Sequence, residues 1–226
     1  MKLPLLSILL IAVLCSNAGS AEPDRQTSEW IQKVLLGPEF GGTGAVCSKW
    51  TKPPSVSVHG GTPDQQRLIT FAVGHLNRTL EGTKLGKLTM RPPDSEADIY
   101  VYFAPLEKMP ELVRRLKFRY VEGNWGYFWT FWGRRNEISR AYVLLANDML
   151  KGEALQHFAL EELTQALGLS NDSPVFRDSI FYAEGDNGGN AQRLSALDQK
   201  LLAFFYNHVT PGMNGAELRE ALEKHW

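Results

Sequence analysis

The sequence predicts a single α/β domain, because segments with the pattern of strands alternate along the chain with segments with the pattern of helices. Residues 98–103 (D-I-Y-V-Y-F) are rich in β-branched and aromatic side chains, as expected of a buried strand. Helical spacing of apolar residues begins after Thr62 and again at about 152–167. The chain has 226 residues and no evident linker, which is enough for one domain with a full core and short for two.

Five short segments have the composition and alternation of strands. Gly60 and Gly61 end the first, Pro92 and Pro93 end the second, and the polar turn 133–136 joins the last two. We therefore predict strands at 56–58, 88–90, 98–103, 127–132 and 138–145.

The longest predicted helix has a strong start signal. Thr62 can cap it, Pro63 suits the first helical position, and Gln65 completes a capping box. Apolar residues from Leu68 to Leu80 then recur at helical spacing, which predicts one buried face. Further helical segments are predicted around Trp30, Val34 and Leu35, at 106–116, at 152–167, at 201–206 and at 216–225.

The first 21 residues have the pattern of a secretory signal peptide. The apolar run 3–14 follows a basic residue, and small residues at 19–21 offer a cleavage site. Cys15 resembles a lipoprotein acylation site, but bulky Leu14 before it disfavours acylation. We predict export through a Sec-type signal to the periplasm or the medium. The predicted division is signal peptide 1–21, flexible lead-in 22–45, domain 46–210 and C-terminal helical tail 211–226.

Composition narrows the class of partner. The formal net charge is -1 and no basic run occurs, so we do not expect the chain to bind nucleic acid. Nothing after the signal is long and apolar enough to predict a stable transmembrane segment. Cys47 alone would remain after processing, and a single free cysteine is usually a buried apolar residue. The sequence leaves the oligomeric state open.

The stretch E-E-L-T-Q-A-L-G-L-S-N-D has the frame of a zinc-peptidase helix without its histidines. In the metzincin pattern H-E-x-x-H-x-x-G-x-x-H, two histidines one helical turn apart bind zinc, and a glycine turns the chain so that a third can return. In this chain Glu161, Gln165 and Asn171 occupy the histidine positions. Glu162 occupies the general-base position, and Gly168 the glycine position.

The chain resembles matrixin-type metzincins beyond this helix. Their Met-turn reads roughly S-x-M-Y, and L-S-x-x-D then leads into a final helix. Residues 179–182 read S-I-F-Y, with Phe181 at the methionine position beside Tyr182, and residues 194–198 read L-S-A-L-D before a helix that reaches Tyr206. The resemblance covers about 56–206.

This resemblance implies a metzincin-like fold: a twisted, mostly parallel sheet with an antiparallel edge strand, packed by a long helix and an active-site helix, plus a C-terminal helix. It also implies structural roles at the site for Gly168, Asp172, Phe181 and Tyr182. The signature is similar, in addition, to that of an uncharacterised family of exported bacterial domains (domain of unknown function 2927).

The substituted ligand set argues against a resident zinc ion. One carboxylate and two amide oxygens are hard, weak ligands, better suited to calcium or magnesium. We expect no cofactor, with a divalent cation (Ca, Mg, Mn or Zn) at Glu161, Gln165 and Asn171 as the alternative. Without a metal-bound water, Glu162 has little to deprotonate and is expected in a hydrogen-bond network. His157, one turn earlier, is expected to be structural.

A second feature is the aromatic segment 120–132, which the resemblance places at the edge of the cleft. Trp125, Trp129, Trp132 and Arg134 are candidate binding residues, for stacking on sugars or for gripping an extended peptide by strand addition. Because alternate residues of a strand face opposite ways, about half of these rings should belong to the core.

The leading hypothesis is an exported metzincin-like domain that has lost its zinc ligands. It would bind a peptide or a cell-envelope component, with weak catalysis or none. One alternative is a metallohydrolase with a Glu/Gln/Asn metal site and Glu162 as general base. Another is a scaffold or assembly factor that contacts a partner protein through segment 120–132.

Overall fold

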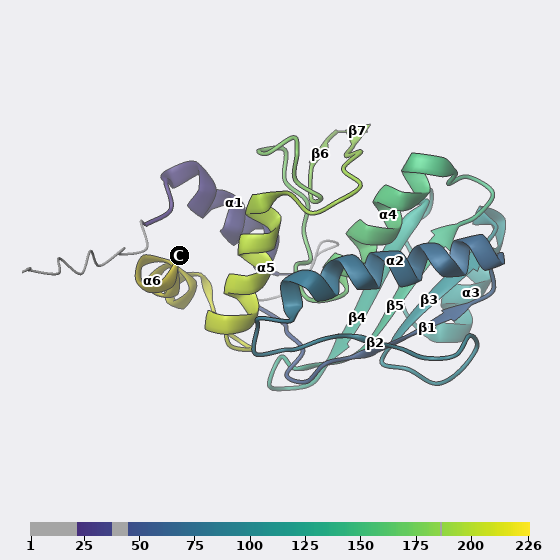
Figure 1. Cartoon of the computed structure of the whole chain (residues 1–226), viewed down its shortest axis with the longest axis horizontal. Helices are drawn as coiled ribbons and strands as arrows, with labels where there is room; N and C mark the ends of the chain where they lie inside the picture. Colours follow the sequence, from purple (N-terminus) through teal and green to yellow (C-terminus); the bar gives the residue numbers. More distant parts are fainter. Residues whose placement is uncertain (1–21, 38–44, 186) are drawn as a thin grey trace, which may run out of the picture.

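The computed structural model describes residues 22–37, 45–185 and 187–226. The predicted signal peptide lies outside these ranges and stays a prediction. The elements run in the following order (Figure 1): α1 (Arg25–Leu35), β1 (Ser55–His59), α2 (Pro63–Leu80), β2 (Thr89–Met90), β3 (Ile99–Ala104), the 3-10 turn η1 (Leu106–Lys108), α3 (Met109–Leu116), β4 (Gly126–Trp132), β5 (Ile138–Ala146), α4 (Gly152–Gln165), β6 (Ala183–Glu184), β7 (Asn187–Gly188), α5 (Ala196–His208) and α6 (Gly215–His225).

Five strands form one sheet in the order β2-β1-β3-β5-β4. The pairs β1–β2, β1–β3 and β3–β5 are parallel, and β4 pairs with β5 in antiparallel register. Parallel neighbours need crossover connections, which α2 and α3 help to supply, whereas the short polar turn after β4 permits a hairpin. The predicted fold class is therefore confirmed: a mostly parallel sheet with an antiparallel edge strand.

The two faces of the sheet are covered by different helices. Inward side chains such as Val58, Val101 and Val143 belong to the large core on the side of α2 and α4. On the other side Tyr127 and Leu144 pack with residues of α3 in a smaller cluster. Figure 1 shows α2 lying along the sheet with α4 beside it. The capping box predicted for α2 at Thr62 is present.

The N-terminal lead-in is more ordered than the sequence predicts, and the C-terminal tail is the helix that it predicts. Within the predicted flexible lead-in, α1 buries Trp30, Ile31, Val34 and Leu35, so this part of the segment is an ordered helix packed on the core. The remaining residues 38–44 lie outside the described ranges. The predicted tail helix is α6, which contacts α1 and α5. Apolar burial explains both, because each helix has one apolar face to cover.

A buried lysine holds the end of α5. The Lys49 ammonium donates to the carbonyl oxygens of Phe205 (2.8 Å), Tyr206 (3.2 Å) and Val209 (2.6 Å). These carbonyls are left without helical partners at a helix C-terminus, where a cation is also favoured. Cys47, two residues earlier, is buried as expected, and burial raises the pKa of its thiol to about 12.

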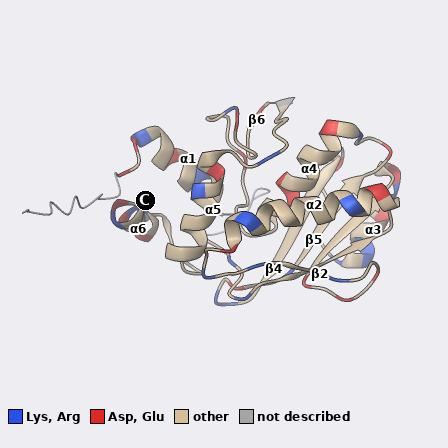
Figure 2. Ribbon diagram, viewed as in Figure 1, with Lys and Arg blue, Asp and Glu red and all other residues tan. Residues whose placement is uncertain are grey.

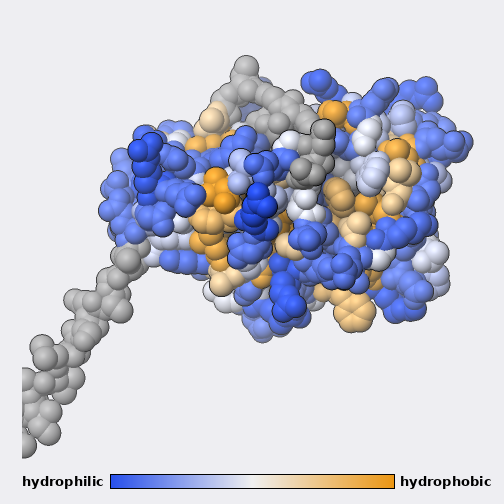
Figure 3. Space-filling view, turned by 90° about the horizontal axis from the view of Figure 1, so that it is seen from above, coloured by the Kyte–Doolittle hydropathy of each residue, from blue (hydrophilic) through white to orange (hydrophobic). Residues whose placement is uncertain are grey.

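The surface has no membrane-spanning feature among the described helices, since none of them is both long and apolar enough to cross a bilayer. Seen from above, apolar side chains show in separate patches between hydrophilic ones (Figure 3).

Candidate functional site

The site is a pocket of about 110 Å³ between α4 and the start of β4. Glu161, Glu162 and Gln165 from α4 line it, together with Asp172 from the chain that follows the helix. The rest of the lining is Asn124, Gly126, Tyr127, Phe158, Ala183 and Gly188. Acidic residues lie at the start of α4 and near its end, and the helix has no lysine or arginine (Figure 2). The pocket is therefore rich in carboxyl groups.

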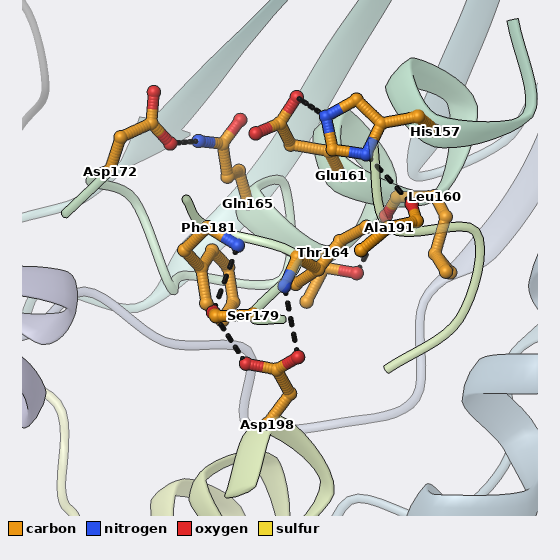
Figure 4. A network of polar contacts seen from close by, with 11 residues as sticks. His157, Leu160, Glu161, Thr164, Gln165, Asp172, Ser179, Phe181, Ala191 and Asp198 are labelled. Atoms are coloured by element: carbon orange, nitrogen blue, oxygen red, sulfur yellow. Dashed lines mark hydrogen bonds and ion pairs between the residues drawn. The ribbon is translucent and has the colours of Figure 1, made fainter. Parts of the chain in front are cut away.

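His157 fixes one side of the site. Its Nδ1 lies 2.7 Å from the carbonyl oxygen of Ala191, and because a carbonyl only accepts, Nδ1 carries a proton. Its Nε2 lies 3.3 Å from Oε2 of Glu161, one helical turn away (Figure 4). Burial opposes a charge on His157, but the hydrogen bond and the charge of Glu161 outweigh it and raise the pKa of His157. Burial also raises the pKa of Glu161. His157 is thus structural, as expected, and it orients Glu161.

Gln165 and Asp172 form a second polar pair. The side-chain amide of Gln165 donates to Oδ1 of Asp172 over 2.7 Å. This bond directs the carbonyl oxygen of Gln165 away from Asp172 and toward Glu161 (Figure 4). Burial, and then the negative charge of Glu161, raise the pKa of Asp172 to about 7. The role of Asp172 is therefore more than the structural one that the resemblance implies, because its carboxyl group lines the pocket.

Asn171 lies apart from this group. Its side-chain amide donates to the carbonyl oxygens of Leu36 (3.3 Å) and Gly37 (2.9 Å), just past the end of α1. It is not among the residues that line the pocket. The structure brings Glu161 and Gln165 together as expected, but it places Asp172, not Asn171, beside them. The bonds to the α1 end explain this, because they turn the Asn171 side chain toward the N-terminal segment.

Gly168 provides the turn that makes this return possible. Its φ is +105°, and a Cβ there would lie 2.4 Å from the carbonyl oxygen of Ser48. Only glycine suits both the conformation and the close approach. Side chains from other elements donate hydrogen bonds to the carbonyl groups at the end of the helix. Trp50 Nε1 donates to the carbonyl of Ala166 (2.9 Å), and the Tyr206 hydroxyl donates to that of Leu167 (2.6 Å). The predicted helix break at Gly168 is present.

The turn that contains Phe181 is tied to α5. Phe181 is fully buried and packs near Trp30, with ring centroids 6.4 Å apart. Its backbone N–H donates to the Ser179 hydroxyl, which donates in turn to Asp198 (Figure 4). Phe181 does not line the pocket, so it belongs to the core around the site. Tyr182 donates from its hydroxyl to Glu184 over 2.6 Å.

The comparison with protein families fits this geometry. A family model described as "Protein of unknown function (DUF2927)" matches residues 24–224. The chain belongs to the DUF2927 family. The match includes α1, in agreement with the packing of that helix on the core of this DUF2927 domain.

No curated protein is significantly similar to the chain. Among solved structures, two of myroilysin are similar to it. One is 16% identical with a TM-score of 0.43 and covers 72% of this chain and 98% of that chain. The other is 14% identical with a TM-score of 0.45 and covers 83% of this chain and 97% of that chain. At these scores the likeness carries no conclusion about the site or the activity of the DUF2927 domain.

None of the predicted aromatic candidates is among the residues that line the pocket of the DUF2927 domain. Trp125 is 42% exposed and Trp132 43% exposed, at either end of β4. Trp129 is half-buried and stacks on Phe118 with centroids 5.7 Å apart, in the cluster beside α3. Arg134 is exposed in the turn after β4. The exposed rings lie at the two ends of β4, whereas the ring within the strand is packed.

Sequence reasoning missed the residues at and just before the start of β4 that line the pocket, Asn124, Gly126 and Tyr127. Gly126 lies close against α4: a Cβ there would lie 2.4 Å from Phe158 Cδ1 and 2.6 Å from Glu162 Oε1. A glycine at the start of an aromatic strand is the signal that could have indicated this approach.

The side chains do not fit the zinc site that the motif implies. Zinc-binding histidines need free nitrogen atoms aimed at one point. In the DUF2927 domain His157 directs one nitrogen to Ala191 and the other to Glu161. Among the described residues, no three or more His, Cys, Asp or Glu side chains are grouped so that they could hold a metal ion.

Proposed function

We propose that this DUF2927 domain is an exported peptide-binding protein, with weak catalysis or none, whose ligand lies along β4 and reaches into the pocket beside α4. The observation that carries the proposal is the position of the pocket at the start of an edge strand. Among the described segments, β4 pairs only with β5. Its outer edge therefore presents backbone groups to which an extended chain can add as a further strand.

The hydrogen-bond register identifies these backbone groups. The N–H of Ala146 donates to the carbonyl of Trp125, so the pair Gly126–Leu145 is one without direct hydrogen bonds. Residues alternate along an antiparallel ladder. The N–H and C=O groups of Phe128 and Thr130 therefore point to the outer edge, and those of Tyr127 and Trp129 point to β5.

The interactions of the motif residues support weak catalysis or none. Glu161 contacts His157, Gln165 bonds to Asp172, and Asn171 bonds to the α1 end. The metallohydrolase alternative needs Glu161, Gln165 and Asn171 to converge, and it has less support because Asn171 is directed elsewhere. The scaffold alternative would use exposed Trp125 and Trp132 without the pocket.

Amide hydrogen exchange tests the proposal. The ligand is the tightest binder selected from a library of random octapeptides displayed with free amino termini. Phe128 and Thr130 amides should exchange quickly in the free domain and become protected on binding, while Tyr127 and Trp129 amides, bonded to β5, serve as internal controls that are protected in both states. If the library yields no binder, or a bound peptide leaves Phe128 and Thr130 unprotected, peptide binding by strand addition to β4 is wrong.

A further inference from the structure

Three side chains that line the pocket, those of Glu161, Gln165 and Asp172, offer oxygen atoms that can accept hydrogen bonds. Gln165 is 2% exposed and uses its amide nitrogen on Asp172. Its carbonyl oxygen accepts no hydrogen bond from any residue that the structure describes, and it faces the pocket beside Glu161 (Figure 4). Because Gln165 lines the pocket, a ligand group there can donate to this oxygen. The reverse orientation of the amide would set this oxygen against the Asp172 carboxylate.

Glu161 provides a hydrogen-bond acceptor whether the proton between His157 and Glu161 lies on the histidine or on the carboxyl group. Its Oε2 faces His157, so a proton shared by the two groups lies on His157 or on that oxygen. The other carboxyl oxygen, on the pocket side, carries no proton in either case and can only accept. The same holds for the Asp172 oxygen that does not bond to Gln165 whenever that carboxyl group is ionised.

The pocket also lacks any built-in cation. Neither lysine nor arginine is among its lining residues. The Tyr127 hydroxyl already donates to the carbonyl of Arg119 over 2.9 Å, so this donor is directed elsewhere. These oxygens accept hydrogen bonds and bring negative charge whenever the carboxyl groups are ionised, so a matching ligand group donates in several directions and carries positive charge.

We propose that the pocket binds a primary ammonium group of the peptide ligand, with Glu161, Gln165 and Asp172 as its hydrogen-bond acceptors. This inference rests on the proposed peptide-binding function and names the chemistry that it selects. An ammonium group has three donors and no acceptor. A cavity of about 110 Å³ has room for this group and the carbons next to it. The ammonium can belong to the amino terminus of the peptide or to a lysine side chain.

The test uses four forms of one selected octapeptide that contains a lysine, with binding measured by calorimetry on the full chain. The forms are unmodified, acetylated at the amino terminus, carrying norleucine for lysine, and carrying both changes. Charged hydrogen bonds predict that loss of the bound ammonium weakens binding about tenfold or more. Acetylation should have this effect if the pocket takes the amino terminus, and norleucine if it takes lysine.

Variants of the domain locate the effect. Glu161→Gln and Asp172→Asn should each remove most of the preference for the ammonium form. Glu153→Gln is the matched control, because it removes one negative charge from the same helix at an exposed position outside the pocket. It should keep the preference. Thermal melting shows whether each variant is folded, and the four peptide forms test the wild-type domain even if a variant unfolds.

The outcomes separate this inference from the proposed function. If all four peptides bind equally well while the β4 amides become protected, the domain binds peptides but the ammonium site is wrong. Preference for an arginine peptide over the lysine form would also overturn the primary-ammonium assignment. So would stoichiometric binding of Ca²⁺ or Zn²⁺ that Glu161→Gln abolishes, without discrimination between the peptides.

Discussion

Two aspartates, the buried Asp198 and the half-buried Asp172, have opposite surroundings. Asp198, at the start of α5, accepts hydrogen bonds from the Ser179 hydroxyl (2.7 Å) and from the backbone N–H groups of Ile180 (2.9 Å) and Ser195 (2.8 Å). Asp172, beside the pocket, accepts one hydrogen bond from the described residues, that of Gln165. Burial raises the pKa of both carboxyl groups, and that of Asp172 reaches about 7.

The different hydrogen-bond partners of the two aspartates distinguish a structural carboxyl group from one that is available to a ligand. Around Asp198 the protein supplies the donors, so the turn of Phe181 and the first turn of α5 are held together. Around Asp172 the protein supplies mostly acceptors, and the missing donors are left for a ligand.

Removing the Asp198 carboxylate should have the largest effect on stability. Asp198→Ala leaves three donors in a buried region without their acceptor, and we expect a loss of about 3 kcal/mol in the free energy of unfolding. Urea unfolding measures it. Asp178→Ala, at an exposed position one residue from Ser179, is the control and should change stability little. A loss for Asp198→Ala no larger than for the control would remove the contrast between the two regions.

Substitutions of the tryptophans in the β4 region should distinguish residues needed for packing from residues needed for peptide binding. Trp129→Ala removes a half-buried ring stacked on Phe118 and should cost about 2 kcal/mol, below the range for fully buried aromatic residues. Trp125→Ala and Trp132→Ala remove exposed rings and should stay within about 0.5 kcal/mol of wild type, while peptide binding weakens. Unfolding and calorimetry on the same three variants provide the comparison. Normal peptide binding by the double variant of Trp125 and Trp132 would assign no binding role to those rings.

The pH dependence of stability should show the cost of ionising Asp172. Its folded pKa of about 7 exceeds its ordinary value of 3.8, so the folded state holds this proton more tightly. Its contribution to stability is fully present below pH 3.8 and is lost as the pH rises through 7. One such proton gives a slope of at most about 1.4 kcal/mol per pH unit in this window.

Urea unfolding between pH 4 and 8 measures that slope, and Asp172→Asn should reduce it. Some slope should remain, because the raised pKa values of His157 and Glu161 act in the same direction. An unchanged slope in Asp172→Asn would mean that this carboxyl group titrates normally in the folded domain.

Local patterns made much of the fold predictable. The five strands and the main helices lie close to the predicted segments because alternation, helical spacing and caps depend on neighbouring residues. Pro110 is an exception in detail: the sequence suggests an early interruption, whereas Pro110 lies in the first turn of α3, where proline is tolerated. The short strands β6 and β7 have no pattern that predicts them.

By itself the sequence determined the helix that carries Glu161 and Gln165 on one face, the break at Gly168 and the order of strands and helices. Only the tertiary structure decided that Asp172 lines the pocket while Asn171 bonds to the α1 end, that His157 orients Glu161, and that Gly126 forms the opposite wall. The physical reason is the sequence separation over which each kind of interaction acts. Periodicity and capping act within a few residues, whereas the side chain that enters a pocket depends on partners more than a hundred positions away, such as Gly37 for Asn171.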